Sequence, residues 1–233
     1  MPRFPGGGSK QRMASSVVCI SRTNGARGDA IGHAVARELG YRYVDEEIVQ
    51  RAAEKAKVDP ATIMDAERRK SFVRRLLEGL PGTSALADPF GTITGPPLGL
   101  EEVTMLAPRT VKQDARDVIR SAIGEFAHEG RVVIVAHAAS MALQGVPGVL
   151  RVLITASPTV RARRISRDGK LLESAAAEAA IRESDRNRQD YLRRFYEVDR
   201  EEPTHYDLVI NTDVLTAQQA TAIVCDATRA TGP

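Results

Sequence analysis

The clearest indication of how this chain folds is the segment Val17-Val-Cys-Ile-Ser-Arg-Thr-Asn-Gly-Ala-Arg-Gly28. It opens with a short apolar run and continues into a segment that holds two glycines. An apolar run bounded by turn residues is typical of a buried strand. Past this segment, Ile31, Val35 and Leu39 recur at helical spacing, and Gly40 is a typical helix stop. The stretch therefore predicts a strand, a glycine loop and a helix in succession.

The alternation of apolar runs and helical patterns continues along the chain. Short apolar runs predict further strands at 41–44, 131–136, 149–155 and 206–211. Apolar residues at helical spacing predict helices at 46–57, 59–80, 110–129, 158–168, 175–198 and 216–229. Continuous apolar strands that alternate with helices indicate a parallel sheet covered on both faces. We therefore predict a three-layer, doubly wound α/β fold, in which the glycine loop lies at the carboxyl ends of the strands.

Two segments stand apart from this alternation. Residues 1–13 are basic and rich in Gly and Pro, which predicts a flexible tail. Residues 81–100 carry many turn residues and little periodicity, which is typical of a long functional or disordered loop. We expect residues 14–233 to form one domain.

Composition excludes several classes of protein. The 233 residues are 42% hydrophobic, which is too apolar for a wholly disordered chain. No apolar run approaches the roughly 20 residues of a membrane-spanning helix, and the basic N-terminus has no apolar core like that of a secretory signal. Cys19 and Cys225 lie too far apart in the sequence for a metal motif, and two cysteines make no disulfide framework. We expect a cytoplasmic protein that does not associate with membranes.

Arginine is unusually frequent. The chain has 27 Arg and 6 Lys, nine of the Arg lie between Arg161 and Arg194, and the net charge is only +3. The excess fits either a GC-rich codon bias or a phosphate site, because the guanidinium fork matches phosphate oxygens. Nucleic acid is a poorer match, because five Tyr, five Phe and no Trp leave few groups for stacking bases.

A strand that runs through a glycine loop into a helix is a natural phosphate site, because backbone N–H groups converge there. The standard P-loop is G-x-x-x-x-G-K-[ST], in which the Lys reaches the outer phosphates. Here Arg22 and Arg27 stand in the two glycine positions, and Gly28 stands in the lysine position. The motif alone leaves open an ordinary strand-to-helix turn, in which Gly25 and Gly28 supply positive φ angles.

The chain from Val17 to Gly40 resembles the cytidylate kinase-like family, whose loop reads S-R-x-x-G-x-G-G-x-x-I-G. It departs at Arg27, where the family usually has Gly. Residues 39–48 resemble the family's L-G-x-x-x-x-D-x-E-[IL], which matches Asp45 and implies a phosphate-binding role for Arg51.

The resemblance resumes in the second half of the chain. Residues 133–139 are similar to V-I-V-G-R-G-A, with His137 in place of the Arg that faces the substrate. That His is either structural or a phosphate contact. The pattern Ile181-x-x-x-Asp185-x-x-Arg188 resembles the helix after the family's lid, which we place at 167–190. Residues 206–212 resemble Y-D-L-x-[IL]-N-T near the nucleotide base, while 58–109 correspond to a variable substrate-side insertion.

The resemblance implies a nucleoside monophosphate kinase-like enzyme that moves the γ-phosphate of ATP to a small acceptor such as CMP or dCMP. The missing lysine keeps open a second interpretation, a catalytically deficient nucleotide-binding regulatory protein. As catalytic residues the resemblance and the charge pattern imply Arg27, Arg186 and Arg188. As nucleotide- or phosphate-binding residues they imply Ser21, Arg22, Gly25, Ala26, Gly28, Asp29, Asp45, Arg51, His137, Arg163, Arg164 and Asn211.

Asp29 has two interpretations of its own. Mg²⁺ is often held by one or two carboxylates together with substrate oxygens, so Asp29 is the candidate metal ligand. An acidic residue in the first turn of a helix is equally explained by the helix dipole. The arginine-rich helices likewise fit either a solvated surface or a phosphate-facing one. The sequence leaves the choice between a monomer and a homo-oligomer open.

Overall fold

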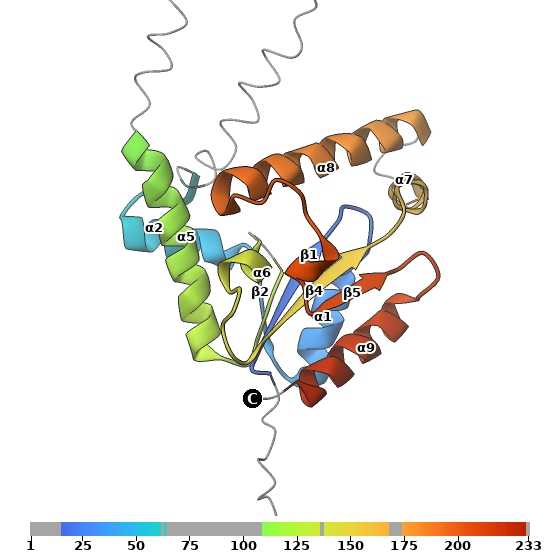
Figure 1. The fold of residues 1–233 in the computed structure, drawn as a ribbon, viewed down its shortest axis with the longest axis horizontal. Helices are drawn as coiled ribbons and strands as arrows, with labels where there is room; N and C mark the ends of the chain where they lie inside the picture. Colours follow the sequence, from blue (N-terminus) through green and yellow to red (C-terminus); the bar gives the residue numbers. More distant parts are fainter. Residues whose placement is uncertain (1–14, 62, 64–108, 136–137, 168–173, 232–233) are drawn as a thin grey trace, which may run out of the picture. The chain divides into compact units, whose positions relative to one another are not determined.

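A computed structural model describes residues 15–61, 63, 109–135, 138–167 and 174–231. The chain divides into two compact units, Met1–Ile48 with Ala122–Pro233, and Val49–Ser121. The first unit holds the sheet and the glycine loop, and it is the unit drawn around the labelled strands in Figure 1.

The first unit is built on a sheet of five parallel strands in the order β2-β3-β1-β4-β5. The strands are β1 (Val17–Arg22), β2 (Arg42–Val44), β3 (Val132–Ile134), β4 (Val149–Thr155) and β5 (Leu208–Asn211). The chain leaves β1 toward β2 on one side and crosses to β4 on the other, so β1 is central. Such a reversal of direction is where ligands bind on doubly wound sheets. The predicted parallel sheet is confirmed.

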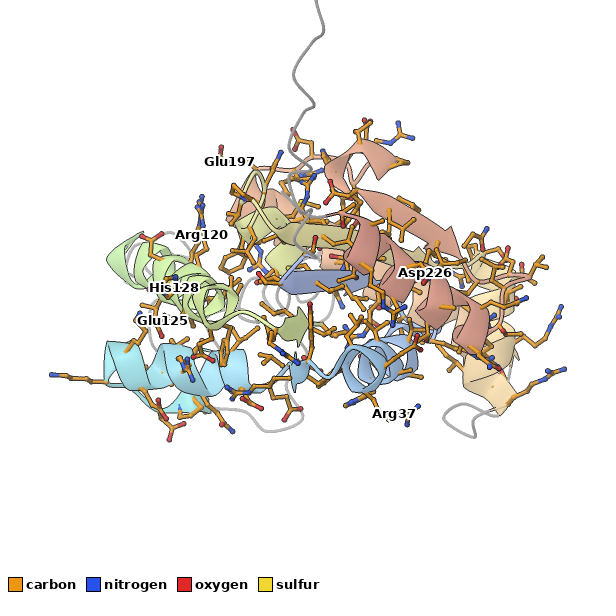
Figure 2. All side chains as sticks on the ribbon, turned by 90° about the horizontal axis from the view of Figure 1, so that it is seen from below. Arg37, Arg120, Glu125, His128, Glu197 and Asp226 are labelled. Atoms are coloured by element: carbon orange, nitrogen blue, oxygen red, sulfur yellow. The ribbon has the colours of Figure 1, made fainter. Side chains whose placement is uncertain are left out.

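One face of the sheet is covered by α1 (Gly28–Leu39) and α9 (Ala217–Ala230), which lie side by side in Figure 1. Alternate strand residues such as Val18 and Ile20 are buried against these helices. Exposed charged residues lie on the outer sides of these helices, among them Arg37 on α1 and Asp226 on α9 (Figure 2). The apolar residues that alternate along the strands thus pack against the apolar faces of the two helices in one layer.

The opposite face is covered by α6 (Ala139–Ala142) and α8 (Ser174–Tyr196). Helix α7 (Pro158–Arg167) packs against α8, and the 3-10 helix η1 (Pro203–His205) precedes β5. Met141 of α6 and Leu192 of α8 pack with Leu153 of β4 in a separate cluster. Helices on both faces of the sheet confirm the predicted three layers. The sequence did not predict α6 and η1, because four and three residues are too short to show a helical period.

The second unit contains most of α2 (Glu47–Ala56) and the first part of α5 (Arg109–Glu129). Within it, the Lys55 ammonium group donates a hydrogen bond to the Ser121 hydroxyl at 2.7 Å. Most of the helix expected at 59–80, the turn-rich segment at 81–100 and the tail at 1–13 fall outside the described residues. No helix in the described part of the chain has both the length and the apolar character needed to span a bilayer.

Candidate functional site

The glycine loop follows β1 at the carboxyl edge of the sheet and leads directly into α1. A cavity of about 320 Å³ lies between this loop and α8. Most of residues 22–29 line it on one side, and Ser184, Asp185 and Arg188 line it on the other. The cavity therefore occupies the place where parallel α/β sheets bind ligands.

The loop presents backbone N–H groups that are free to bind an anion. In the described part of the chain, the N–H groups of Gly25, Arg27 and Gly28 form no backbone hydrogen bond. Arg27 is the N-cap of α1, and its side chain makes no capping hydrogen bond. An uncapped helix N-terminus carries a partial positive charge. The loop thus has the donors and the field that favour a phosphate group.

Three successive carbonyl groups of the loop are held from behind. The carbonyl oxygen of Asn24 accepts from Arg161 Nη1 at 3.4 Å, and that of Gly25 accepts from Arg164 Nη1 at 3.3 Å. The Thr212 hydroxyl donates to the carbonyl oxygen of Ala26 at 3.1 Å. The backbone of the loop is thus anchored to α7 and to the residue that follows β5.

Gly25 is required by its surroundings as well as by its backbone. Its φ angle is +82°, which side chains other than glycine rarely adopt. A Cβ atom at this position would also lie 3.0 Å from the Cβ atom of Arg161. Arg27 has a φ angle of 68°, in the same left-handed region. Its backbone explains why glycine is usual at this position in the family that the loop resembles.

Arg161 fixes α7 against α8 and the loop. Its guanidinium group is almost fully buried and makes two hydrogen bonds to the Asp185 carboxylate, at 2.9 and 2.7 Å. Its Nε atom donates to the carbonyl oxygen of Ala156 at 3.0 Å. Nothing in the sequence separated Arg161 from the eight other arginines nearby, because each of them follows the same helical pattern.

Arg188 is held on the wall of the cavity by the half-buried carboxylate of Glu201. Its Nε atom donates to Glu201 at 2.8 Å, and its Nη2 atom donates to the other oxygen of Glu201 at 2.5 Å and to the Tyr206 hydroxyl at 3.2 Å. The Tyr206 hydroxyl also donates to Glu201. Two donors of Nη1 remain without a partner among the described residues.

The pKa values of all three groups in this contact depart from their ordinary values. Burial lowers the pKa of Arg188, but the hydrogen bonds and charge of Glu201 outweigh burial and raise it overall. Burial raises the pKa of Glu201, but Arg188 outweighs that and holds it below its usual range. Burial raises the pKa of Tyr206. At neutral pH the site therefore holds an ionised pair and a neutral phenol.

Three further arginines lie on or near the loop. Arg22 forms an ion pair with Asp29. Arg27 is exposed and has no carboxylate partner within the described residues. Burial lowers the pKa of Arg164, and the nearby charge of Arg27 lowers it further. A cation that is not neutralised thus faces the cavity from the loop.

The structure brings some predicted residues together and leaves others apart. Arg22, Gly25, Arg27, Gly28, Asp29 and Arg188 all line the cavity. Arg164 lies behind the loop and holds its backbone at Gly25, whereas Ala26 is a buried residue of the loop whose carbonyl oxygen is held by Thr212. Ser21 is buried and donates to the Ser140 hydroxyl at 3.1 Å, beneath the same loop.

Four other predicted residues of the first unit, Arg163, Arg186, Asn211 and Asp45, are not among the described residues that line this cavity. Arg163 and Arg186 are exposed. The Asn211 side chain accepts a hydrogen bond from the backbone N–H of Asp213 at 2.9 Å. Asp45 directly follows β2, at the carboxyl edge of the sheet. Arg51 belongs to the second unit, and His137 lies outside the described residues, so their roles stay predictions.

Several residues of the site were missed by sequence reasoning. Thr23, Asn24, Ser184 and Asp185 line the cavity, and Glu201 and Tyr206 hold Arg188. Asp185 and Arg188 belong to the pattern that resembles the helix after the family's lid, and both lie on α8. Glu201 carries no such signal, because it lies in an irregular segment beyond the end of α8.

Comparisons with known proteins show which proteins this chain is similar to. Two curated relatives named cytidylate kinase, from Pyrobaculum arsenaticum and Pyrobaculum islandicum, are 37% and 35% identical over 111 and 114 residues. These alignments cover 47% and 48% of this chain, and 59% and 60% of the relatives. The chain thus spans about six tenths of the length of the curated relatives it matches.

The fold is similar to that of a solved, uncharacterized protein from Eubacterium ventriosum, with a TM-score of 0.59 and 14% identity. That match covers 91% of this chain and 97% of the other. At this level of identity the likeness shows the fold alone. The profile of the cytidylate kinase-like family matches residues 17–214, which is most of the chain, so the chain belongs to the cytidylate kinase-like family.

Proposed function

We propose that the chain is a nucleotide-dependent kinase that transfers the γ-phosphoryl group of ATP to a small acceptor, nominally CMP or dCMP. One observation carries the proposal: the cavity at the carboxyl edge combines free loop N–H groups with the side chains of Arg22, Arg27 and Arg188. Membership of the cytidylate kinase-like family and the names of the Pyrobaculum relatives support it.

The proposed reaction asks mainly for positioning and for neutralisation of charge. An acceptor phosphate oxygen attacks the γ-phosphorus, the bond from that phosphorus to the β–γ bridging oxygen breaks, and ADP leaves with the bonding electrons. Loop N–H groups would hold the donor phosphates. Arg27, and Arg188 through its free Nη1 donors, would stabilise the charge that develops on the transferred group.

ATP is normally used with Mg²⁺, and two carboxylates of the cavity are candidate ligands for that ion. Asp29 and Asp185 line the cavity, and Asp185 is already bound at both oxygens by Arg161. Asp29 is more exposed and pairs with a single arginine. Within the described residues no three His, Cys, Asp or Glu side chains form a cluster. This donor set fits an ion held by one carboxylate and by phosphate oxygens, so Asp29 would hold Mg²⁺, which would offset phosphate charge.

A coupled assay that follows ADP release tests the kinase. The purified chain would be assayed with ATP and Mg²⁺ against CMP, dCMP, UMP, AMP and GMP. The proposal expects turnover with at least one pyrimidine monophosphate above the rate of ATP hydrolysis alone. If a folded preparation that binds ATP shows no turnover with any of these acceptors, the proposed kinase activity is contradicted.

The second candidate is a nucleotide-binding regulatory protein without turnover. It is favoured by the ion pairs Arg22–Asp29 and Arg188–Glu201, which offset two of the cavity's positive charges. Calorimetry that finds ATP or CMP bound tightly, with no transfer in the coupled assay, would support it. A chain that binds neither nucleotide contradicts both candidates. A cytoplasmic location, the absence of nucleic-acid binding and the oligomeric state stay predictions.

A further inference from the structure

Positions 22 and 28 of the loop cannot both carry a side chain. A Cβ atom added to Gly28 would lie 2.4 Å from the Cβ atom of Arg22 and 2.8 Å from its Cδ atom. The first of these atoms is fixed by the backbone, so no rotation of the Arg22 side chain relieves the overlap. One of the two positions must be glycine while the loop keeps this conformation.

The side chain of Arg22 uses the space that Gly28 leaves. It passes over Gly28 and forms an ion pair with Asp29 in the first turn of α1. Both Arg22 and Gly28 line the cavity. A guanidinium group is thereby held next to the free N–H groups at the start of α1.

In the standard P-loop the glycine and the cationic residue occupy these two positions in the reverse order. In G-x-x-x-x-G-K-[ST], glycine stands first and the lysine that reaches the outer phosphates stands seventh. Here arginine stands first, at Arg22, and glycine stands seventh, at Gly28. Because the two Cβ positions are mutually exclusive, a cation can enter the loop from either position but not from both.

We propose that Arg22 and Gly28 are a reciprocal exchange of the glycine and lysine of a P-loop, with Arg22 as the phosphate-binding cation. This inference rests on the proposed function for the identity of the ligand. It distinguishes Arg22 from Arg27, which also lines the cavity. Arg27 is exposed, and its charge acts on Arg164 of α7, whereas Arg22 is drawn over the loop by Asp29. Asp29 is thus a positioning residue for Arg22.

The packing part of the proposal is tested without any ligand. Gly28→Ala is made in three backgrounds: wild type, Arg22→Ala and Arg22→Gly. Overpacking should lower the melting temperature by about 5 °C or more in the wild-type and Arg22→Ala backgrounds. In the Arg22→Gly background the same substitution should change it by less than about 2 °C. An equal effect of Gly28→Ala in all three backgrounds would overturn the exchange.

The charge part is tested by calorimetric binding of inorganic pyrophosphate. Loss of one charge-assisted contact in Arg22→Gly should weaken binding at least about tenfold. The double variant Arg22→Gly/Gly28→Lys should return to within about threefold of wild type, and the matched control Arg22→Gly/Gly28→Ala should stay weak. A folded double variant that binds as weakly as Arg22→Gly alone contradicts the proposal.

The two proposals fail in different ways. Pyrophosphate binding could be present in the wild type, lost in Arg22→Gly and regained in the double variant, while the wild type phosphorylates no acceptor. That result would support Arg22 as the loop cation and contradict the kinase activity. Conversely, the wild-type protein could phosphorylate an acceptor, and Arg22→Gly could leave both the rate and the pyrophosphate affinity unchanged. That result would support the kinase activity and contradict the role of Arg22 as the loop cation.

Discussion

Two arginine–carboxylate pairs lie toward opposite edges of the same sheet and make the same kind of contact. Arg151 and Asp207 pair at the amino ends of β4 and β5, with distances of 3.1 and 2.7 Å. Arg188 and Glu201 pair beside the loop cavity at the carboxyl edge, with distances of 2.8 and 2.5 Å. Both carboxylates have a pKa below the ordinary value, since their arginines outweigh the effect of burial.

The surroundings of the two pairs differ. Asp207 also accepts from the backbone N–H of Arg151 at 2.9 Å, and its own N–H donates to the Arg151 carbonyl oxygen. This exchange joins two neighbouring strands. Arg188 instead faces the cavity with its Nη1 donors unpaired in the described part of the protein. Pairing alone therefore does not distinguish the two arginines, and the difference between them is that Arg188 lines a cavity.

The largest difference between the two pairs is expected in catalysis. Arg188→Ala should lower kcat/KM by about 10³, because it removes a cation aimed at the transferred phosphate. Arg151→Ala should leave kcat/KM within about twofold, because Arg151 does not reach the cavity. Steady-state kinetics with ATP and the best acceptor measures both.

A control separates catalysis from folding at Arg188. Removing that arginine leaves Glu201 with a poorly solvated charge, so Arg188→Ala should also destabilise the fold. The double variant Arg188→Ala/Glu201→Gln should recover stability but not rate. Recovery of rate in the double variant would show that Arg188 acts only by holding the structure.

A smaller effect is expected in the pH dependence of stability. A carboxylate whose pKa is lower in the folded protein stabilises the fold fully above its unfolded pKa, and that contribution is lost as the pH falls through the folded pKa. At pH 7, Glu201→Gln should lower the free energy of unfolding by about 1–3 kcal/mol. Asp207→Asn should lower it by less than about 1 kcal/mol, because Asp207 is partly exposed.

Urea denaturation between pH 7 and pH 3 checks this expectation. The difference between each variant and wild type should be constant above about pH 5 and should shrink below about pH 4. A difference that grows on acidification would show that the carboxylate is neutral in the folded protein.

The smallest effect is expected from the loop backbone. Arg27→Gly relieves a left-handed backbone and should raise the free energy of unfolding by about 1 kcal/mol. It also removes a cation from the cavity, so the KM for ATP should rise by a few-fold. Arg131 provides a matched control, because it has a φ angle of 50° at the start of β3, at the other edge of the sheet. Arg131→Gly should leave the KM unchanged, and an equal rise in both variants would contradict a role for Arg27.

The parts of the molecule that could be predicted are those that local patterns determine. The strand at 17–22, the loop and α1 follow from an apolar run, two glycines and a helical period within 24 residues. The site depends instead on residues distant in the sequence, such as Arg161 with Asp185 and Arg188 with Glu201. Exposed and buried arginines share the same helical spacing on α7 and α8, so only tertiary contacts distinguish them.

The close approach of positions 22 and 28 also limits how such a loop can change by single substitutions. A chain that passes from glycine and lysine to arginine and glycine must go through one of two intermediates. Arginine with lysine overlaps at the two Cβ positions, and glycine with glycine has no cation at either position. The second intermediate is free of this overlap but lacks the proposed phosphate-binding cation, so we expect it only where another arginine, such as Arg27, carries the charge. The two loop types are thus separated by an epistatic barrier that follows from one interatomic distance.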